Sequence, residues 1–116
     1  MKVIEFDFYN WGEFEEYLNS LPNKDAAKLL AIIDKIENLG LITAQKQKWV
    51  KKLERNLYEI RSKQGSNIQR SIYFHWENNK YIITHGFTKK TQKTPKREIV
   101  KGIHRREIYE RKHHHE

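Results

Sequence analysis

The sequence has 116 residues, and its 12% of aromatic residues argue for one folded domain with its own core and against a disordered chain. The 23 lysines and arginines outnumber the 15 acidic residues and give a net charge of +8, which favours a polyanionic partner such as nucleic acid. The lack of cysteine excludes disulfides, a thiolate nucleophile and cysteine-ligated zinc.

The first half of the chain predicts a strand and two helices. In residues 3–9, VIEFDFY, acidic and apolar residues alternate as in a half-buried strand. Asn10 and Glu13 then resemble a capping box, and apolar residues follow at helical spacing. The clearest helix spans residues 25–39, where an apolar stripe runs along one side, and Gly40 ends it. The two helices form a hairpin whose stripe must be covered, and we expect a sheet to cover it.

The second half predicts three strands and a last helix. We expect residues 41–56, which are polar and rich in lysine, to form an irregular or loosely extended connector. Three strand-like runs follow, over residues 57–63, 68–76 and 81–88. Their separators have hairpin length, which predicts an antiparallel meander. Thr94 and Pro95 form a good cap for a helix from 95 to 109, although Gly102 weakens it. The chain is therefore predicted to be an α+β domain.

We expect a single domain over residues 1–110. The tail, residues 111–116 with the sequence RKHHHE, resembles a disordered extension or a remnant of cloning. Three adjacent histidines cannot all face one metal ion from a helix, so we predict neither a metal site nor a cofactor. No apolar run approaches the ~20 residues that span a bilayer, and the N-terminus does not look like a signal peptide. These features predict a cytoplasmic protein with no membrane partner.

Two arginines lie inside predicted strands. Arg70 is on the more apolar face of its strand, where a charge is costly unless it is paired. It requires either an ion pair with Glu59 across the hairpin or contact with a polyanion. Tyr73 and His85 are also on strands, and a lone histidine there is more often a hydrogen-bonded core residue than an acid or base.

The sequence lacks the spacing of a Ser/His/Asp site, a glycine-rich phosphate loop or a zinc-binding HExxH motif. If the protein is an enzyme, its catalytic groups would therefore be arginine, lysine, histidine or tyrosine side chains. Such groups suit metal-free cleavage of RNA, in which the 2′-hydroxyl attacks the adjacent phosphate. Cations then stabilise the developing charge, and a lysine or histidine moves protons.

Three segments together resemble a known family: LYEIR, QRSIYF and, above all, residues 85–99, HGFTKKTQKTPKREI. They are similar to the HigB-type, phage-derived branch of the RelE/ParE toxin superfamily, and the resemblance covers nearly the whole chain. It implies an N-terminal strand, a helical hairpin, a curved antiparallel sheet and a C-terminal helix. It also implies the toxin of a type II toxin–antitoxin system, paired with an antitoxin that binds DNA through a helix-turn-helix. Similar toxins cut mRNA without metal, usually in the ribosomal A site.

The resemblance assigns Arg61 and Arg70 to the scissile phosphate. A proton carrier or charge stabiliser is expected among Lys89, Lys90 and Lys93, with His85 and Tyr73 as lesser candidates. Further RNA contacts are predicted for basic residues elsewhere on the surface: Lys48, Lys51, Lys52, Lys63 and Lys96.

Three alternatives to an mRNA endonuclease stay open, because proteins of one fold can act on different targets. The chain could be a non-catalytic toxin that inhibits a protein such as DNA gyrase. It could also be a simple nucleic-acid-binding domain, and by charge alone the basic turn at residues 89–97 could be a solvated loop. The third alternative is a degenerate toxin retained as a protein-interaction module.

Overall fold

The computed structural model describes residues 1–113 and confirms the α+β class. Its elements are, in chain order, β1 (Glu5–Phe8), α1 (Trp11–Asn19), α2 (Asn23–Leu39), α3 (Leu41–Lys46), β2 (Val50–Glu54), β3 (Leu57–Gln64), β4 (Asn67–Glu77), β5 (Lys80–Lys89) and α4 (Lys96–His113). The strands form one sheet in the order β1-β5-β4-β3-β2. The meander β2 to β5 is antiparallel, whereas β1 pairs with β5 in parallel, so the sheet is mixed.

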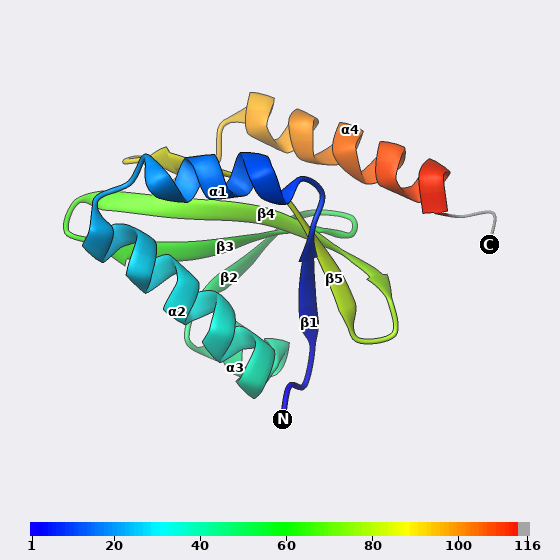
Figure 1. Cartoon of the computed structure of the whole chain (residues 1–116), viewed down its shortest axis with the longest axis horizontal. Coiled ribbons are helices and arrows are strands. Elements are labelled where there is room, and N and C mark those ends of the chain that lie inside the picture. Colours follow the sequence, from blue (N-terminus) through cyan, green and yellow to red (C-terminus); the bar gives the residue numbers. More distant parts are fainter. Residues whose placement is uncertain (114–116) are drawn as a thin grey trace.

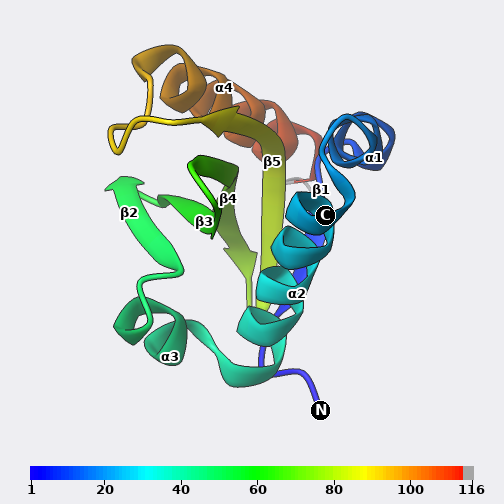
Figure 2. The ribbon, with the colours of Figure 1, turned by 90° about the vertical axis from the view of Figure 1, so that its left-hand side faces the viewer.

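Helices α1 and α2 pack on one face of the sheet and α4 on the other (Figures 1 and 2), so the sheet separates two apolar cores. On one face, α1 and α2 bury residues such as Phe14, Leu29 and Ile36 together with Ile60 and Tyr73 of the sheet. The other face carries the smaller core, where Ile99 and Ile103 of α4 pack on Leu57, Ile72 and Phe74. The predicted helical hairpin therefore covers the sheet as expected, and α4 covers the second face more thinly.

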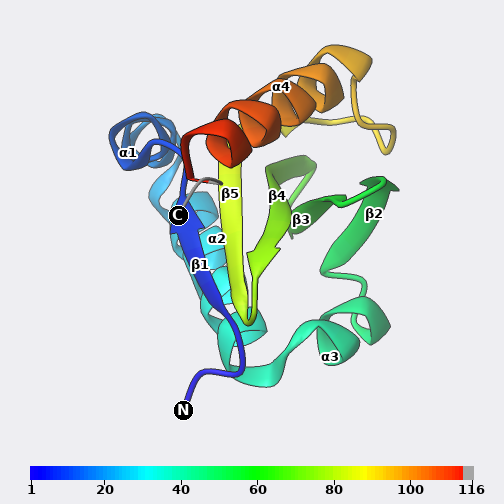
Figure 3. The same ribbon diagram turned by 90° about the vertical axis from the view of Figure 1, so that its right-hand side faces the viewer.

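The prediction of a connector over residues 41–56 was wrong, because this segment forms α3 and β2 (Figure 3). Helix α3 is only six residues long and is anchored by the fully buried Ala44. Strand β2 lies at the edge of the sheet and exposes Lys51 and Lys52, so its sequence has none of the apolar alternation of a half-buried strand. Helix α4 continues to His113, so residues 111–113 of the predicted tail are helical, and residues 114–116 lie outside the described part of the chain.

Helix α4 is held by close packing and by charge. A Cβ atom added to Gly102 would lie 2.9 Å from the Ile72 side chain, so this glycine lets the helix approach the sheet. Near the middle of the helix, both terminal nitrogens of Arg105 donate to the Glu13 carboxylate on α1 at 2.8 Å. The glycine that lowers intrinsic helix propensity thus permits the docking of α4.

The two edges of the sheet differ in how they are covered. The backbone N–H of Phe6 in β1 donates to the buried Glu37 carboxylate of α2 at 2.8 Å, and the Glu37 carbonyl accepts from Val3 and Ile4. Helix α2 therefore takes the place of a neighbouring strand at this edge. The opposite edge is short, and the candidate site begins there.

Candidate nucleic-acid interface

Strand β2 covers only the first half of its neighbour β3. Val50 pairs with Ile60, and the last contact in this direction is the bond from the Arg61 N–H to the Trp49 carbonyl, at 2.7 Å. Among the described residues, no strand pairs with β3 on this side beyond that point, so from Ser62 to Gln64 its only neighbouring strand is β4 on the other side. The early end of β2 therefore leaves a recess at the edge of the sheet.

A hollow of about 360 Å³ occupies this recess, and we call it the basic hollow. It is lined by Lys28 and Ile32 of α2, by Lys48 and Trp49 before β2, by Arg61, Ser62 and Lys63 of β3, by Ile68 of β4, and by Gln92. Four of these described lining residues are cations and none is acidic. A concave surface with charge of one sign concentrates counter-ions, so the basic hollow is suited to an anionic ligand.

The approach to the hollow contains an unusual backbone conformation at Lys48. Its φ angle is +63°, in the left-handed region that residues with a Cβ rarely adopt. This residue turns the chain from α3 into β2, and the next N–H, that of Trp49, donates to the Ala44 carbonyl at 2.9 Å. The turn directs Lys48 and the half-buried Trp49 into the lining of the hollow.

Arg61 connects the hollow to the buried interior. Its side chain is 20% exposed, and its Nε lies 3.4 Å from Oε1 of Glu59, which is fully buried. One terminal nitrogen of Arg61 donates to the Gln92 carbonyl at 2.5 Å. Arg61 is therefore held by a carboxylate behind it and a carbonyl beside it, while part of its guanidinium stays accessible to a ligand.

The loop between β5 and α4 is held from below by the second arginine. Arg70 is fully buried, and its guanidinium donates to the carbonyls of Lys93, at 3.3 Å, and Thr91. The Thr94 hydroxyl also contacts both oxygens of Glu59, at 2.7 and 2.9 Å. Arg61, Arg70 and Glu59 thus fix four consecutive residues, 91–94, against the sheet.

The structure brings some of the predicted site residues together. Arg61, Lys48 and Lys63 all line the basic hollow. Lys90 and Lys93 are exposed on either side of Gln92, in the loop that borders it, and Lys89 is half-buried at the end of β5. Three further lysines are exposed but are not among the residues that line the hollow: Lys51, Lys52 and Lys96.

Tyr73 and His85 lie away from the hollow. Tyr73 is 1% exposed, and its ring packs on Tyr58 and Phe6 in the larger core, where burial raises the pKa of its phenol. His85 is buried in the opposite face, with Nε2 3.0 Å from the Glu98 carboxylate. Burial lowers the pKa of His85 to about 4, because desolvation outweighs the attraction of Glu98 for the charged imidazolium.

Sequence reasoning missed six lining residues: the polar or aromatic Lys28, Trp49, Ser62 and Gln92, and the apolar Ile32 and Ile68. Lys28 lies on α2, and its ammonium donates to the Lys63 carbonyl, a contact between residues 35 apart in the chain. No local sequence pattern predicts such a contact. For Trp49 a signal was present, since a tryptophan among lysines is a typical nucleic-acid-binding composition.

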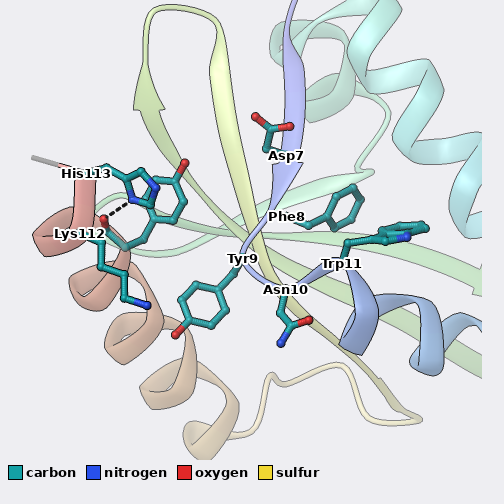
Figure 4. A pocket seen from close by; sticks show the side chains of 8 residues that line it. Asp7, Phe8, Tyr9, Asn10, Trp11, Lys112 and His113 are labelled. Carbon is teal, nitrogen blue, oxygen red and sulfur yellow. Dashed lines mark hydrogen bonds between the residues drawn. The ribbon is translucent and has the colours of Figure 1, made fainter. Parts of the chain in front are cut away.

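A second and larger hollow, of about 620 Å³, lies between the start of α1 and the end of α4. Figure 4 shows Lys112 and His113 of α4 across from Tyr9 and Trp11. Its lining is largely aromatic, and Asp7 opposes Lys112 in charge. This aromatic hollow therefore provides less positive charge for binding a polyanion than the basic hollow does. Elsewhere within residues 1–113, no cluster of three or more His, Asp or Glu side chains is arranged to hold a metal ion.

The family model for phage-derived Gp49-like proteins (DUF891) matches residues 16–107, a range that includes every residue lining the basic hollow. The chain belongs to this family. Gp49-like proteins are part of the RelE/HigB-like toxin–antitoxin superfamily, which confirms the coarser part of the resemblance. A search of curated proteins finds no match to this Gp49-like chain. Within residues 1–113, no helix has the length and apolar character needed to cross a bilayer.

Proposed function

We propose that this Gp49-like chain is a HigB-type toxin of a type II toxin–antitoxin system. Its proposed activity is metal-independent cleavage of mRNA, on the ribosome and in the cytoplasm. The observation that carries the proposal is the basic hollow, in which four cations and no acid line a concave surface of a chain from a toxin–antitoxin family. A phosphodiester backbone is the ligand that best matches this charge.

Arg61 is the residue we assign to the scissile phosphate. Its guanidinium is partly accessible, and Glu59 and Gln92 already fix its orientation. A fixed guanidinium can donate two parallel hydrogen bonds to phosphate oxygens, and it needs little reorganisation as charge builds up on them. Lys28, Lys48 and Lys63 are then placed to bind neighbouring phosphates.

The proposed reaction uses the RNA's own nucleophile. The 2′-oxygen bonds to the adjacent phosphorus and loses its proton to solvent, and the bond from phosphorus to the 5′-oxygen breaks. A lysine of the 89–93 loop supplies the proton that the departing 5′-oxygen takes up, with Lys90 and Lys93 as the exposed candidates. The products are a 2′,3′-cyclic phosphate and a 5′-hydroxyl.

Arg70 acts on the reaction through the loop. Because its guanidinium is fully buried beneath the carbonyls of Thr91 and Lys93, it sets the position of the lysines rather than binding the phosphate directly. A small DNA-binding antitoxin is the proposed protein partner, since toxins of this superfamily are neutralised by one.

The test is a cleavage assay with purified protein, translating ribosomes and a defined mRNA, in which primer extension maps the cut sites. Wild-type protein is expected to cut within A-site codons. Arg61→Ala is expected to be slower by about 10²–10³-fold, the usual effect of removing one group that stabilises transition-state charge. Arg97→Ala is the matched control, because Arg97 lies on α4, exposed and away from the hollow, and it should cut at the wild-type rate.

Intact mRNA in the presence of folded wild-type protein contradicts the proposal. RNA binding that weakens gradually with each lysine removed, without cleavage, indicates a plain nucleic-acid-binding domain. Inhibition of supercoiling in a parallel gyrase assay, again without cleavage, indicates a toxin of the same fold with a protein target.

A further inference from the structure

The basic hollow contains an aromatic ring among its cations. Trp49 lines the hollow, is half-buried, and packs by its inner side against the larger core. Its backbone is fixed at both ends of the residue, since its N–H donates to Ala44 and its carbonyl accepts from Arg61. The ammonium of Lys35 lies 5.8 Å from the centre of the ring. A half-buried indole beside four cations is the composition of a surface that binds single-stranded nucleic acid.

A buried polar group in the same lining lacks a partner. Ser62 is 1% exposed, and within residues 1–113 its hydroxyl has no hydrogen-bond partner. Buried hydroxyls are normally satisfied, so one that lines a hollow indicates a ligand atom or a water molecule there. Ser62 follows Arg61 directly in β3, so the two side chains are on opposite faces of the strand, and both residues line the hollow at the open edge of the sheet.

We infer that the basic hollow is a nucleotide subsite, in which an unpaired RNA base stacks on Trp49 and the Ser62 hydroxyl bonds a polar atom of the same nucleotide. The inference rests on the proposed function and specifies its substrate as single-stranded RNA. Phosphate recognition by Arg61, Lys28 and Lys63 does not depend on base pairing, whereas a base can present its face to Trp49 only when it is unstacked from its neighbours.

The size of the hollow is consistent with one nucleotide. Its volume of about 360 Å³ is at the lower end of the roughly 300–1,000 Å³ typical of small-molecule sites. Lys28 and Ile32 of α2 bound it on one side and Gln92 of the loop on the other. A single nucleotide enters such a space, while a duplex stays outside it. The subsite therefore selects loops and unpaired stretches of RNA.

The first measurement is the fluorescence of Trp49 itself. The chain has three tryptophans, and the double variant Trp11→Phe/Trp76→Phe leaves Trp49 as the only one. Titration with a short 2′-O-methyl RNA oligonucleotide, which the proposed reaction cannot cut, should quench this emission. Inorganic tripolyphosphate, which carries charge but no base, should bind without comparable quenching. Equal quenching by both ligands overturns the stacking assignment.

The second measurement is the affinity of the same oligonucleotide for Trp49 variants. Trp49→Ala is expected to bind about tenfold more weakly, as is usual when one stacking platform is removed, and Trp49→Phe to stay within about threefold of wild type. Trp49→Phe also guards against a folding defect in Trp49→Ala, and each variant is checked by thermal unfolding. Trp11→Phe is the matched control, since Trp11 is 48% exposed in the aromatic hollow, and it should bind like wild type.

The outcomes separate this inference from the proposed function. If Trp49→Ala keeps wild-type affinity while Arg61→Ala loses it, the nucleotide subsite is wrong and RNA cleavage at Arg61 still stands. If wild-type protein cuts mRNA and prefers duplex to single-stranded oligonucleotide, the subsite is again wrong. If wild-type protein neither binds the oligonucleotide nor cuts mRNA, both proposals fail.

Discussion

Arg70 and Glu59 form an ion pair in which both side chains are completely buried, with Nε of Arg70 3.6 Å from Oε2 of Glu59. An ion pair with Glu59 across the hairpin was one of the two interpretations that the sequence allowed for Arg70. Glu59 also contacts Arg61 and the Thr94 hydroxyl. One carboxylate thus connects a buried arginine, a partly exposed arginine and the end of the loop over residues 90–94, which we call the lysine loop.

Removal of either partner of this pair leaves an uncompensated buried charge. We expect Glu59→Gln to lower the free energy of unfolding by about 3–5 kcal/mol, the usual cost of breaking a buried ion pair from one side. Urea denaturation monitored by circular dichroism measures it. Arg97→Ala removes an arginine that is 74% exposed and should change the same quantity by less than ~0.5 kcal/mol. Equal effects of the two substitutions would contradict the structural role of the pair.

The lysine loop should lose its fixed position when Arg70 is shortened. Arg70→Lys keeps one positive charge but cannot donate to the carbonyls of Thr91 and Lys93 together. Amide hydrogen exchange of Glu98 and Ile99, whose N–H groups donate to the Pro95 carbonyl directly after the loop, is expected to become faster by about tenfold, because local opening of this turn costs less when the loop is released. Residues of β1, at the other edge of the sheet, serve as the internal reference and should keep their exchange rates.

The free energy of unfolding should decrease as the pH falls, because of the buried His85. Burial and the positive charges of Lys101 and Arg105 lower the pKa of His85, and the attraction of Glu98 offsets only part of this effect. The pKa therefore falls from 6.5 to about 4. In the unfolded chain the imidazole binds a proton below pH 6.5, whereas in the folded protein it does so only near pH 4. The stabilisation is therefore complete above about pH 6.5 and is lost as the pH falls from 6.5 to 4.

Urea denaturation of the wild type and of His85→Gln at pH 7.5 and pH 5.0 tests this dependence. Wild-type protein should lose about 2 kcal/mol more than the variant between these two values, since each pH unit in that window is worth up to ~1.4 kcal/mol. His104→Gln is the control, because His104 is exposed on the same helix α4, and it should behave like wild type. A pH dependence that is identical in wild type and His85→Gln would exclude His85 as its source.

Two lysines on α2 provide a test of the basic hollow. Lys28 lines it, and Lys24, one turn earlier, does not. Loss of a phosphate contact reduces the salt dependence of RNA binding, so Lys28→Ala should lower the slope of log K against log[salt] by about 0.7–0.9. Lys24→Ala should leave the slope and the affinity unchanged. Filter binding at several salt concentrations measures both, and equal effects would show that only overall charge matters.

The close approach of α4 to the sheet predicts opposite effects at two glycines. Gly102→Ala places a methyl group 2.9 Å from Ile72, which is fully buried and cannot move aside, and should cost about 1–2 kcal/mol net of the gain in helix propensity. Gly12→Ala meets only the Asn10 side chain at 3.5 Å and should stabilise α1 by roughly 0.5–1 kcal/mol. Thermal unfolding of both variants measures the difference, and stabilisation by Gly102→Ala would contradict the packing described for α4.

Local patterns in the sequence were sufficient to predict most of the helices and strands. The alternation in residues 57–63 and 68–76 identified β3 and β4 to within a residue or so, and the apolar stripe over 25–39 identified α2. These patterns succeed because a strand or helix that covers a core repeats its apolar residues at a fixed period. Strand β2 was not predicted, because an edge strand needs only one hydrogen-bonded neighbour and can keep its lysines in water.

The sequence by itself determined the fold class, the excess of positive charge and the presence of arginines on two adjacent strands. It did not determine which arginine is buried: Arg61 and Arg70 pair directly across the hairpin, and the more apolar face on which Arg70 lies fits either a buried ion pair or contact with a polyanion at the surface. Only the tertiary structure distinguished them, by closing the 91–94 loop over Arg70 and ending β2 beside Arg61. It also joined Lys28 to Lys63 and Gln92 around one hollow, through contacts between distant residues that no local period encodes.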